Sequence, residues 1–219
     1  MLGIVAVSES KSHRALLAIN RMREAMLPVS NGMKIGISGA QGSFSEEAAR
    51  QYAKSAGYDD AEFVYLDFVE RVLEALEKGE IEIGIFAIEN SNGGVVTEYL
   101  PAIAAHRFAI ERLFDLNVQH MLLVKPGTKK EDVKTIVSQN QAIRQCRMYL
   151  KRAWPQAEIK EYEDTAKAAE DIASSTLPAS CAAIASRAAG EVYKLEILEE
   201  SIQDLKFNVT TFIVAKRLG

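Results

Sequence analysis

Glycines and small polar residues gather at the point where the first predicted strand gives way to a helix. This junction, Gly39–Ser45, contains two glycines that let the backbone turn sharply. The free N–H groups at the start of the following helix suit a carboxylate or a phosphate. The segment has neither the Lys-Ser/Thr pair of a Walker A loop nor the three-glycine dinucleotide fingerprint. The alternative is a tight turn with a helix cap, since Ser43 and Glu46 fit a capping box.

Polar residues gather at three further junctions. In Ile88–Val96 an apolar strand ends in consecutive polar side chains and two glycines, a pattern that faces a ligand, locks a hinge or makes a structural turn. The segment Ser138–Cys146 is equally compatible with a ligand site and a helix cap. Glu163–Ala166 reads as an ordinary helix start.

The last junction, Ile202–Phe212, leads into a strand with two adjacent threonines. Because neighbours on a strand face opposite ways, only one of Thr210 and Thr211 can point into a given cleft. Taken alone, this strand reads as structural. His120 lies among apolar residues and is expected to be a satisfied, half-buried side chain rather than a base. No Ser/His/Asp order and no paired carboxylates stand out.

The elements that hold these junctions alternate between strand and helix. The expected strands are 34–38, 62–66, 82–87, those within 109–124, 135–138, those opening 158–174 and 181–190, 195–200 and 209–215. Helices are expected at 44–55, 68–78, through Ala105, at 141–154 and in the second parts of 158–174 and 181–190. Repeated units of this length predict an α/β fold with mainly parallel sheets covered by helices. Ligands in such folds bind beyond the carboxyl ends of the strands.

Composition narrows the classes of protein. The 219 residues carry a formal net charge of −4 with no long basic run, which argues against a nucleic-acid partner. No apolar run approaches the roughly 18 residues that span a bilayer, so no membrane partner is expected. Cys146 and Cys181 show no metal-ligand spacing and are expected to be reduced. Residues 1–32 read as a helical extension, a linker or a dimerisation helix without a secretory signal, and a cytoplasmic location is expected.

In this order and spacing, the junctions resemble the prephenate dehydratase family. The family's Gly-x-x-Gly-Thr-Phe-Ser matches Gly39–Ser45 with Ser43 in place of threonine, and its Ile-Glu-Asn-Ser-x-x-Gly-x-Val matches Ile88–Val96. Its Gln-Ala-x-x-Gln-Cys, Ala-Ala-Ile-Ala and Ile-x-Asp-x-x-x-Asn-x-Thr-Arg-Phe motifs match Gln141–Cys146, Ala182–Ala185 and Ile202–Phe212. Each motif alone is a weak signal for the family, but five motifs in this order and spacing make a specific signal.

The resemblance implies a two-lobed fold like that of periplasmic binding proteins, with the active site in the interlobe cleft. Lobe one would comprise 33–115 plus 195–219, and lobe two 116–194. The implied enzyme is a carbon–oxygen lyase that converts prephenate to phenylpyruvate, with loss of water and CO2, in phenylalanine biosynthesis. It needs no metal or organic cofactor, and the family's habit predicts a homodimer or higher homo-oligomer.

The resemblance also implies roles for individual residues. Thr210 matches the catalytic threonine, which would donate to the leaving hydroxyl, and Asn208 would orient its strand. The substrate's carboxylates and carbonyl would be held by the remaining matched residues, which are Gly42, Ser43, Asn90, Ser91, Gln141 and Thr165.

Two departures from the family pattern matter. Thr211 stands where the family has arginine, so a bidentate donor is missing beside the catalytic position. Many members carry a C-terminal ACT domain that senses phenylalanine, whereas this sequence ends at Gly219, so no feedback within the chain is expected. The alternatives are a related enzyme acting on prephenate or arogenate, and a non-catalytic module that binds a small anion.

Overall fold

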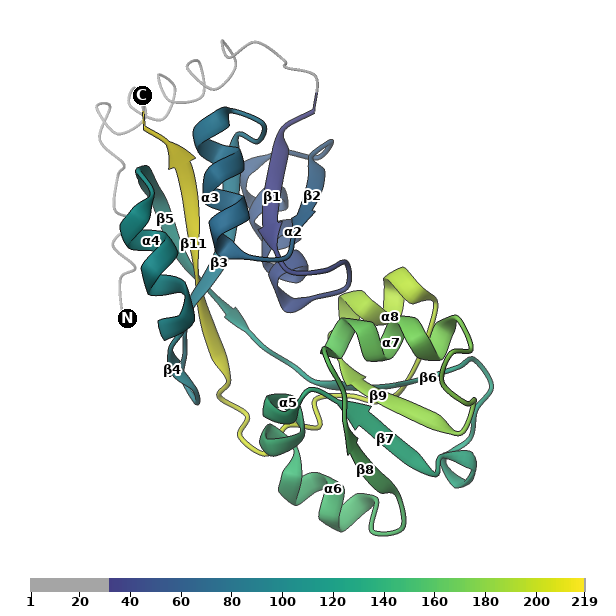
Figure 1. The fold of residues 1–219 in the computed structure, drawn as a ribbon. Coiled ribbons are helices and arrows are strands. Elements are labelled where there is room, and N and C mark those ends of the chain that lie inside the picture. The colour runs from purple at the N-terminus through teal and green to yellow at the C-terminus, as the bar shows by residue number, and fades with distance from the viewer. Residues whose placement is uncertain (1–31, 219) are drawn as a thin grey trace, which may run out of the picture. The chain divides into compact units, whose positions relative to one another are not determined.

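The computed structural model describes residues 32–218 as two mixed β-sheets flanked by helices (Figure 1). Residues 1–31 of the expected helical extension lie outside the described residues. No helix within 32–218 has both the length and the apolar character to cross a membrane.

The first sheet has the strand order β2-β1-β3-β11-β5, with β4 paired to β3. Its strands are β1 (Lys34–Ser38), β2 (Glu62–Leu66), β3 (Ile83–Asn90), β4 (Gly94–Val95), β5 (Phe108–Asn117) and β11 (Val209–Arg217). Strand β1 runs parallel to β2 and β3, whereas β11 runs antiparallel to both β3 and β5. The last strand of the described chain therefore lies inside the first sheet.

The second sheet has the order β10-β6-β9-β7-β8. Its strands are β6 (Met121–Val124), β7 (Thr135–Ser138), β8 (Glu158–Glu161), β9 (Cys181–Ala185) and β10 (Glu196–Glu199). Strand β7 is parallel to β8 and β9, and β6 is antiparallel to β9 and β10.

The predicted α/β architecture with two sheets is confirmed, but the expectation of mainly parallel sheets is wrong. Parallel neighbours need a crossover connection, usually a helix, and only two of the strand pairings in each sheet are parallel. Strands β5, β6, β10 and β11 adjoin the two segments that link the sheets, and they pair antiparallel. The boundary expected at residue 195 is also misplaced, because β10 pairs with β6 in the second sheet.

Helices occupy most of the connections between strands. They are α2 (Phe44–Ala56), α3 (Val69–Lys78), η1 (Thr97–Tyr99), α4 (Leu100–Ala105), η2 (Lys130–Asp132), α5 (Asn140–Gln145), α6 (Arg147–Ala153), α7 (Thr165–Ala173) and α8 (Arg187–Tyr193). The single helix expected over 141–154 is interrupted at Cys146. There the Asp204 carboxylate accepts hydrogen bonds from the N–H groups of Met148 (2.8 Å) and Tyr149 (2.7 Å), which caps α6 separately.

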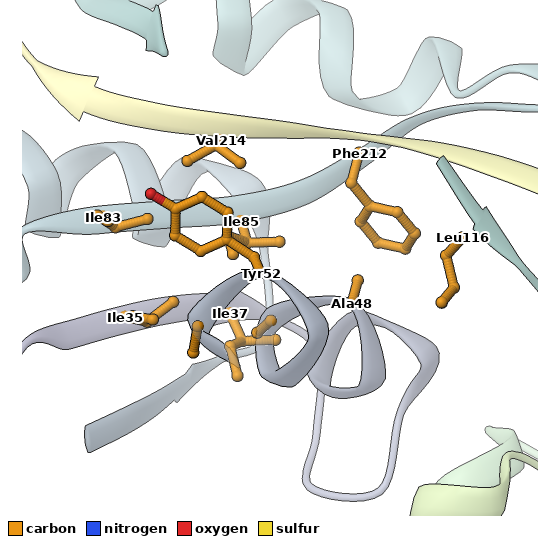
Figure 2. Close-up of a cluster of buried hydrophobic side chains, with 11 residues drawn as sticks. Ile35, Ile37, Ala48, Tyr52, Ile83, Ile85, Leu116, Phe212 and Val214 are labelled. Carbon is orange, nitrogen blue, oxygen red and sulfur yellow. The ribbon is translucent and has the colours of Figure 1, made fainter. Parts of the chain in front are cut away.

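Strand β11 is buried on both faces. Phe212 and Val214 pack with Ile35 and Tyr52 in the core between the sheet and α2 (Figure 2). Ile213, from the other face, packs with the apolar side of α3. Side chains alternate along a strand, so this packing fixes the register in which the preceding threonines are presented.

Two segments without regular secondary structure, 118–120 and 200–208, connect the sheets and are hydrogen-bonded to each other. The Val118 N–H donates to the Asn208 carbonyl at 2.7 Å, and the Ile202 N–H donates to the His120 carbonyl at 2.9 Å. Asn208 and His120 thus belong to one paired backbone linker.

Candidate active site

Thr210 and Asn90 face each other across β11 and β3. The antiparallel register pairs their Cα positions, and the Asn90 Nδ2 donates to Thr210 Oγ1 at 2.9 Å. Thr210 is 8% exposed. The Thr210 hydroxyl oxygen thus accepts from Asn90, and the hydroxyl proton has no acceptor within residues 32–218. The hydroxyl is therefore free to donate to a bound molecule.

The turn after β3 fixes the orientation of the Asn90 amide. Its Oδ1 accepts hydrogen bonds from the N–H groups of Asn92 (2.9 Å) and Gly93 (3.0 Å), which directs Nδ2 toward β11. A Cβ at Gly93 would lie 3.1 Å from Gln141 Nε2. Glycine at this position therefore allows Gln141, the first residue of the Gln141–Cys146 motif, to approach the Asn90 turn.

A pocket of about 870 Å³ opens beside this turn. The lining includes Gln141 and Asn208 from the predicted site. It also includes the guanidinium of Arg144 and the carboxylates of Glu161 and Glu163. The other lining residues are Asn92, Gly93, Gln139, Asn140, Gln145, Tyr162, Gln203, Asp204 and Leu205. Such a mixture of amides, one guanidinium and carboxylates suits a small polar ligand better than an apolar one.

Asn208 connects the pocket to the threonine. It is fully buried, its Oδ1 accepts from Asn90 Nδ2 at 3.0 Å, and its Nδ2 donates to Gln145 Oε1 at 3.2 Å. Thr210 itself does not line the pocket. It accepts a hydrogen bond from Asn90, and Asn90 also donates to Asn208, which lines the pocket wall. Asn90, Gln141, Asn208 and Thr210 are thus brought together.

The remaining predicted site residues perform local structural tasks. Ser43 caps α2 by accepting from the Glu46 N–H at 3.3 Å, and the Glu46 carboxylate accepts from the Gly42 N–H at 2.5 Å. This reproduces half of the expected capping box. The Gly42 carbonyl accepts from Ser186 Oγ at 2.6 Å.

Ser91 and Thr165 also lie outside the pocket lining. Ser91 exchanges two hydrogen bonds with the backbone of Val209, which locks β3 to β11. Thr165 is buried at the first position of α7, whose free N–H groups are capped by Asp164. Any direct contact between these two residues and a ligand stays a prediction.

Thr211 points away from Thr210. Its hydroxyl donates to Asp115 Oδ1 on β5 at 2.7 Å. The pairing of β11 with β5 keeps its register from Val209 to Val214, although the pairing with β3 shifts between Thr211 and Phe212. An arginine at position 211 would start from the sheet face opposite the catalytic candidate. The departure from the family pattern therefore leaves the Asn90–Thr210 contact unchanged.

His120 differs from the sequence-based expectation of a satisfied, half-buried side chain. It is 3% exposed, and its Nδ1 has no hydrogen-bond partner within the described chain. Its Nε2 lies 2.6 Å from Gln145 Oε1. Gln145, Arg144 and Gln203 were not assigned roles from sequence. The only signal for Gln145 was its place in the Gln141–Cys146 motif.

Burial lowers the pKa of His120, so the folded chain holds this imidazole neutral. The unfolded chain binds a proton at His120 as the pH falls through about 6.5, whereas the folded chain does not. The free energy of unfolding therefore decreases as the pH is lowered. We expect His120→Gln to show a weaker fall between about pH 7.5 and about pH 5.5. Urea unfolding at both pH values measures this, and identical pH dependence in variant and wild type would contradict it.

Comparison with known proteins identifies the family. The family model described as prephenate dehydratase matches residues 35–218. The chain is 34% identical over 187 residues to an arogenate dehydratase/prephenate dehydratase of Arabidopsis thaliana, a match that covers 85% of this chain and 44% of the relative. The chain thus spans less than half the length of that relative.

Two solved structures share the fold. A prephenate dehydratase from Arthrobacter aurescens, in complex with L-Phe, superposes with a TM-score of 0.76 at 29% identity, covering 85% of this chain and 61% of that one. The quorum quenching acylase GqqA superposes with a TM-score of 0.75 at 26% identity, covering 85% of this chain and 64% of that one. The matched range contains both sheets and all four residues that the site brings together. The chain therefore belongs to the prephenate dehydratase family.

Proposed function

We propose that this chain is a carbon–oxygen lyase that converts prephenate to phenylpyruvate, water and CO2. The observation that carries the proposal is the Asn90–Thr210 hydrogen bond, which leaves the Thr210 proton free in a buried position. The family membership of the chain supports it further. In metabolic terms, the proposed reaction serves phenylalanine biosynthesis.

The reaction asks little covalent chemistry of the protein. As the ring carboxylate leaves as CO2, the C–C electron pair enters the ring and the C–O bond breaks. The departing hydroxyl takes up one proton to become water. A hydrogen bond from Thr210 Oγ1 stabilises the developing negative charge on that oxygen, because a buried donor is worth more than one in water. Holding the substrate in one orientation supplies the rest.

The pocket offers groups for the other ends of the substrate. Arg144 can pair with one carboxylate, and the amide of Gln141 can donate to a carboxylate or to the keto oxygen. Roles for Gly42, Ser43, Ser91 and Thr165 remain part of the proposal at the level of the motif. Gly42 accepts from Ser186 at the start of α8, and Ser91 bonds the turn that carries Asn90 to Val209.

L-Arogenate is the second candidate substrate. It carries an ammonium group where prephenate has a keto oxygen, and the carboxylates of Glu161 and Glu163 line the pocket. A carboxylate attracts an ammonium group and repels a dianion. The relative from Arabidopsis thaliana bears both substrates in its name.

The experiment is a direct assay of the purified chain with each substrate. Phenylpyruvate is followed by its alkaline absorbance and phenylalanine by chromatography, with an enzyme-free control for spontaneous acid breakdown. We expect a rate above the control with prephenate. Turnover of arogenate alone would move the assignment to the second candidate, and no turnover of either by folded protein would refute the proposal in favour of a binding module.

A homodimer or higher homo-oligomer and a cytoplasmic location stay predictions from the sequence. Light scattering on the eluting peak of a gel-filtration column measures the oligomeric state directly. A monomer at assay concentration would contradict the predicted assembly without touching the proposed reaction.

A further inference from the structure

Five polar side chains form one continuous series of hydrogen bonds that ends at Thr210. His120 Nε2 lies 2.6 Å from Gln145 Oε1, and Asn208 Nδ2 donates to the same oxygen at 3.2 Å. Asn90 Nδ2 then donates to Asn208 Oδ1 at 3.0 Å and to Thr210 Oγ1 at 2.9 Å. We name this series the His120–Thr210 chain.

Each hydrogen bond of the His120–Thr210 chain has a fixed donor and a fixed acceptor. An amide oxygen can only accept, so the ring nitrogen of His120 that faces Gln145 must carry its proton. Nδ1 is then the bare nitrogen, which agrees with its lack of a partner within residues 32–218. Asn90 sets the other end, because backbone N–H groups hold its Oδ1.

Reversing one member would disturb the rest. If His120 carried its proton on Nδ1, the lone pair of Nε2 would face the Gln145 oxygen, and the amide would turn its NH2 toward the ring. That NH2 would then oppose the NH2 of Asn208. Turning Asn208 in response would place its NH2 against Asn90 Nδ2, which the turn after β3 prevents from rotating.

Contacts outside the series hold the backbones of His120 and Gln145 and the ring of His120. The backbone N–H of His120 donates to Gln203 Oε1 at 3.0 Å, and the imidazole ring packs edge-to-face with the Phe44 ring, with centroids 5.3 Å apart. The backbone carbonyl of Gln145 accepts from the backbone N–H of Asp204 at 2.7 Å, beside the break between α5 and α6. Within residues 32–218, the hydrogen bonds of these two side chains are all members of the series. Their placement is explained by the chain they begin.

We propose that His120 and Gln145 are positioning residues that fix the hydrogen-bond direction of Asn208 and Asn90, so that the Thr210 hydroxyl donates toward the substrate. This inference rests on the proposed dehydratase activity and deepens it. His120 acts in its neutral form with the proton on Nε2. It neither touches the substrate nor exchanges a proton with it.

The test compares two variants of His120 that differ in one donor. His120→Gln places an amide N–H near the original Nε2, whereas His120→Leu fills the site without a donor. We expect His120→Leu to lower kcat about tenfold or more with little change in KM, and His120→Gln to recover most of the loss. Gln145→Met, which removes the acceptor at the pocket wall, should reproduce the loss and serves if His120→Leu fails to fold.

A double-mutant cycle links the effect to the threonine. In a Thr210→Val background, which has no hydroxyl to orient, His120→Leu should lower the residual rate far less than in the wild type. Long-range 1H–15N NMR of the imidazole reports the tautomer independently of activity. We expect a protonated Nε2 and a bare Nδ1.

The outcomes separate this inference from the proposed function. A wild-type chain inactive on prephenate and arogenate would refute the function and the inference with it. An active wild type in which folded His120→Leu and Gln145→Met keep full kcat would overturn the inference alone. Additive effects in the cycle, or a protonated Nδ1, would overturn it as well.

Discussion

Thr210→Val is expected to lower kcat for dehydration by about 10²- to 10⁴-fold, the range typical for removing a group that assists proton transfer. Valine keeps the shape and the strand preference of threonine, so β11 and its core contacts should remain. What disappears is the hydroxyl that accepts from Asn90 and is free to donate. Steady-state kinetics on prephenate measure the effect, with KM expected to change little.

Two variants control this prediction. Thr210→Ser keeps the hydroxyl and should retain most of the activity. Thr211→Val removes the neighbouring hydroxyl, which donates to Asp115 on the other face of the sheet, and should leave kcat near the wild-type value. Comparable losses of kcat in Thr210→Val and Thr211→Val would contradict a specific role for the Thr210 hydroxyl in the reaction. Near wild-type kcat in a folded Thr210→Val protein would contradict it as well.

Asn90→Asp is expected to lower kcat/KM about a hundredfold or more, although the two side chains have nearly the same shape. The change replaces the NH2 that donates to Asn208 and Thr210 with a carboxylate oxygen. Thr210 would then donate its proton to the new carboxylate instead of the substrate. The added charge would also repel a dianionic substrate, so the loss should be larger at low ionic strength.

Asn117→Asp is the matched control for this change. Asn117 is an exposed residue at the end of β5, paired with Val209, and takes no part in the His120–Thr210 chain. It introduces the same charge into the same sheet and should leave kcat/KM near the wild-type value. Equal losses in both variants would mean that a general charge effect, rather than the two hydrogen bonds of Asn90, explains the result.

Much of the fold could be predicted from local patterns, because apolar periodicity and junction residues mark the elements. The strand over 34–38 and the helix from Phe44 are confirmed to within a residue. Strand direction is different, since an apolar run looks the same in parallel and antiparallel pairs. The mixed sheets therefore could not be predicted from the pattern around β5 and β11.

The site was predictable where family motifs name a residue, and less so where distant contacts decide its orientation. Asn90, Asn208 and Thr210 come together as the motifs suggest. Gln145 gained no role from sequence, because its orientation depends on the helix break that Asp204 stabilises from far along the chain. The tautomer of His120 follows from a partner that only the folded chain supplies.

The central place of β11 has a consequence for biosynthesis on the ribosome. Strand β11 pairs with β3 on one side and β5 on the other, yet its residues are translated more than ninety positions after β5 ends. The second sheet, built from 121–199, can form while β3 and β5 still lack their shared neighbour. Nascent chains should therefore expose unpaired strand edges that invite aggregation until residue 217 has emerged. Thr210 arrives on that same strand, so the catalytic candidate and the first sheet are completed together.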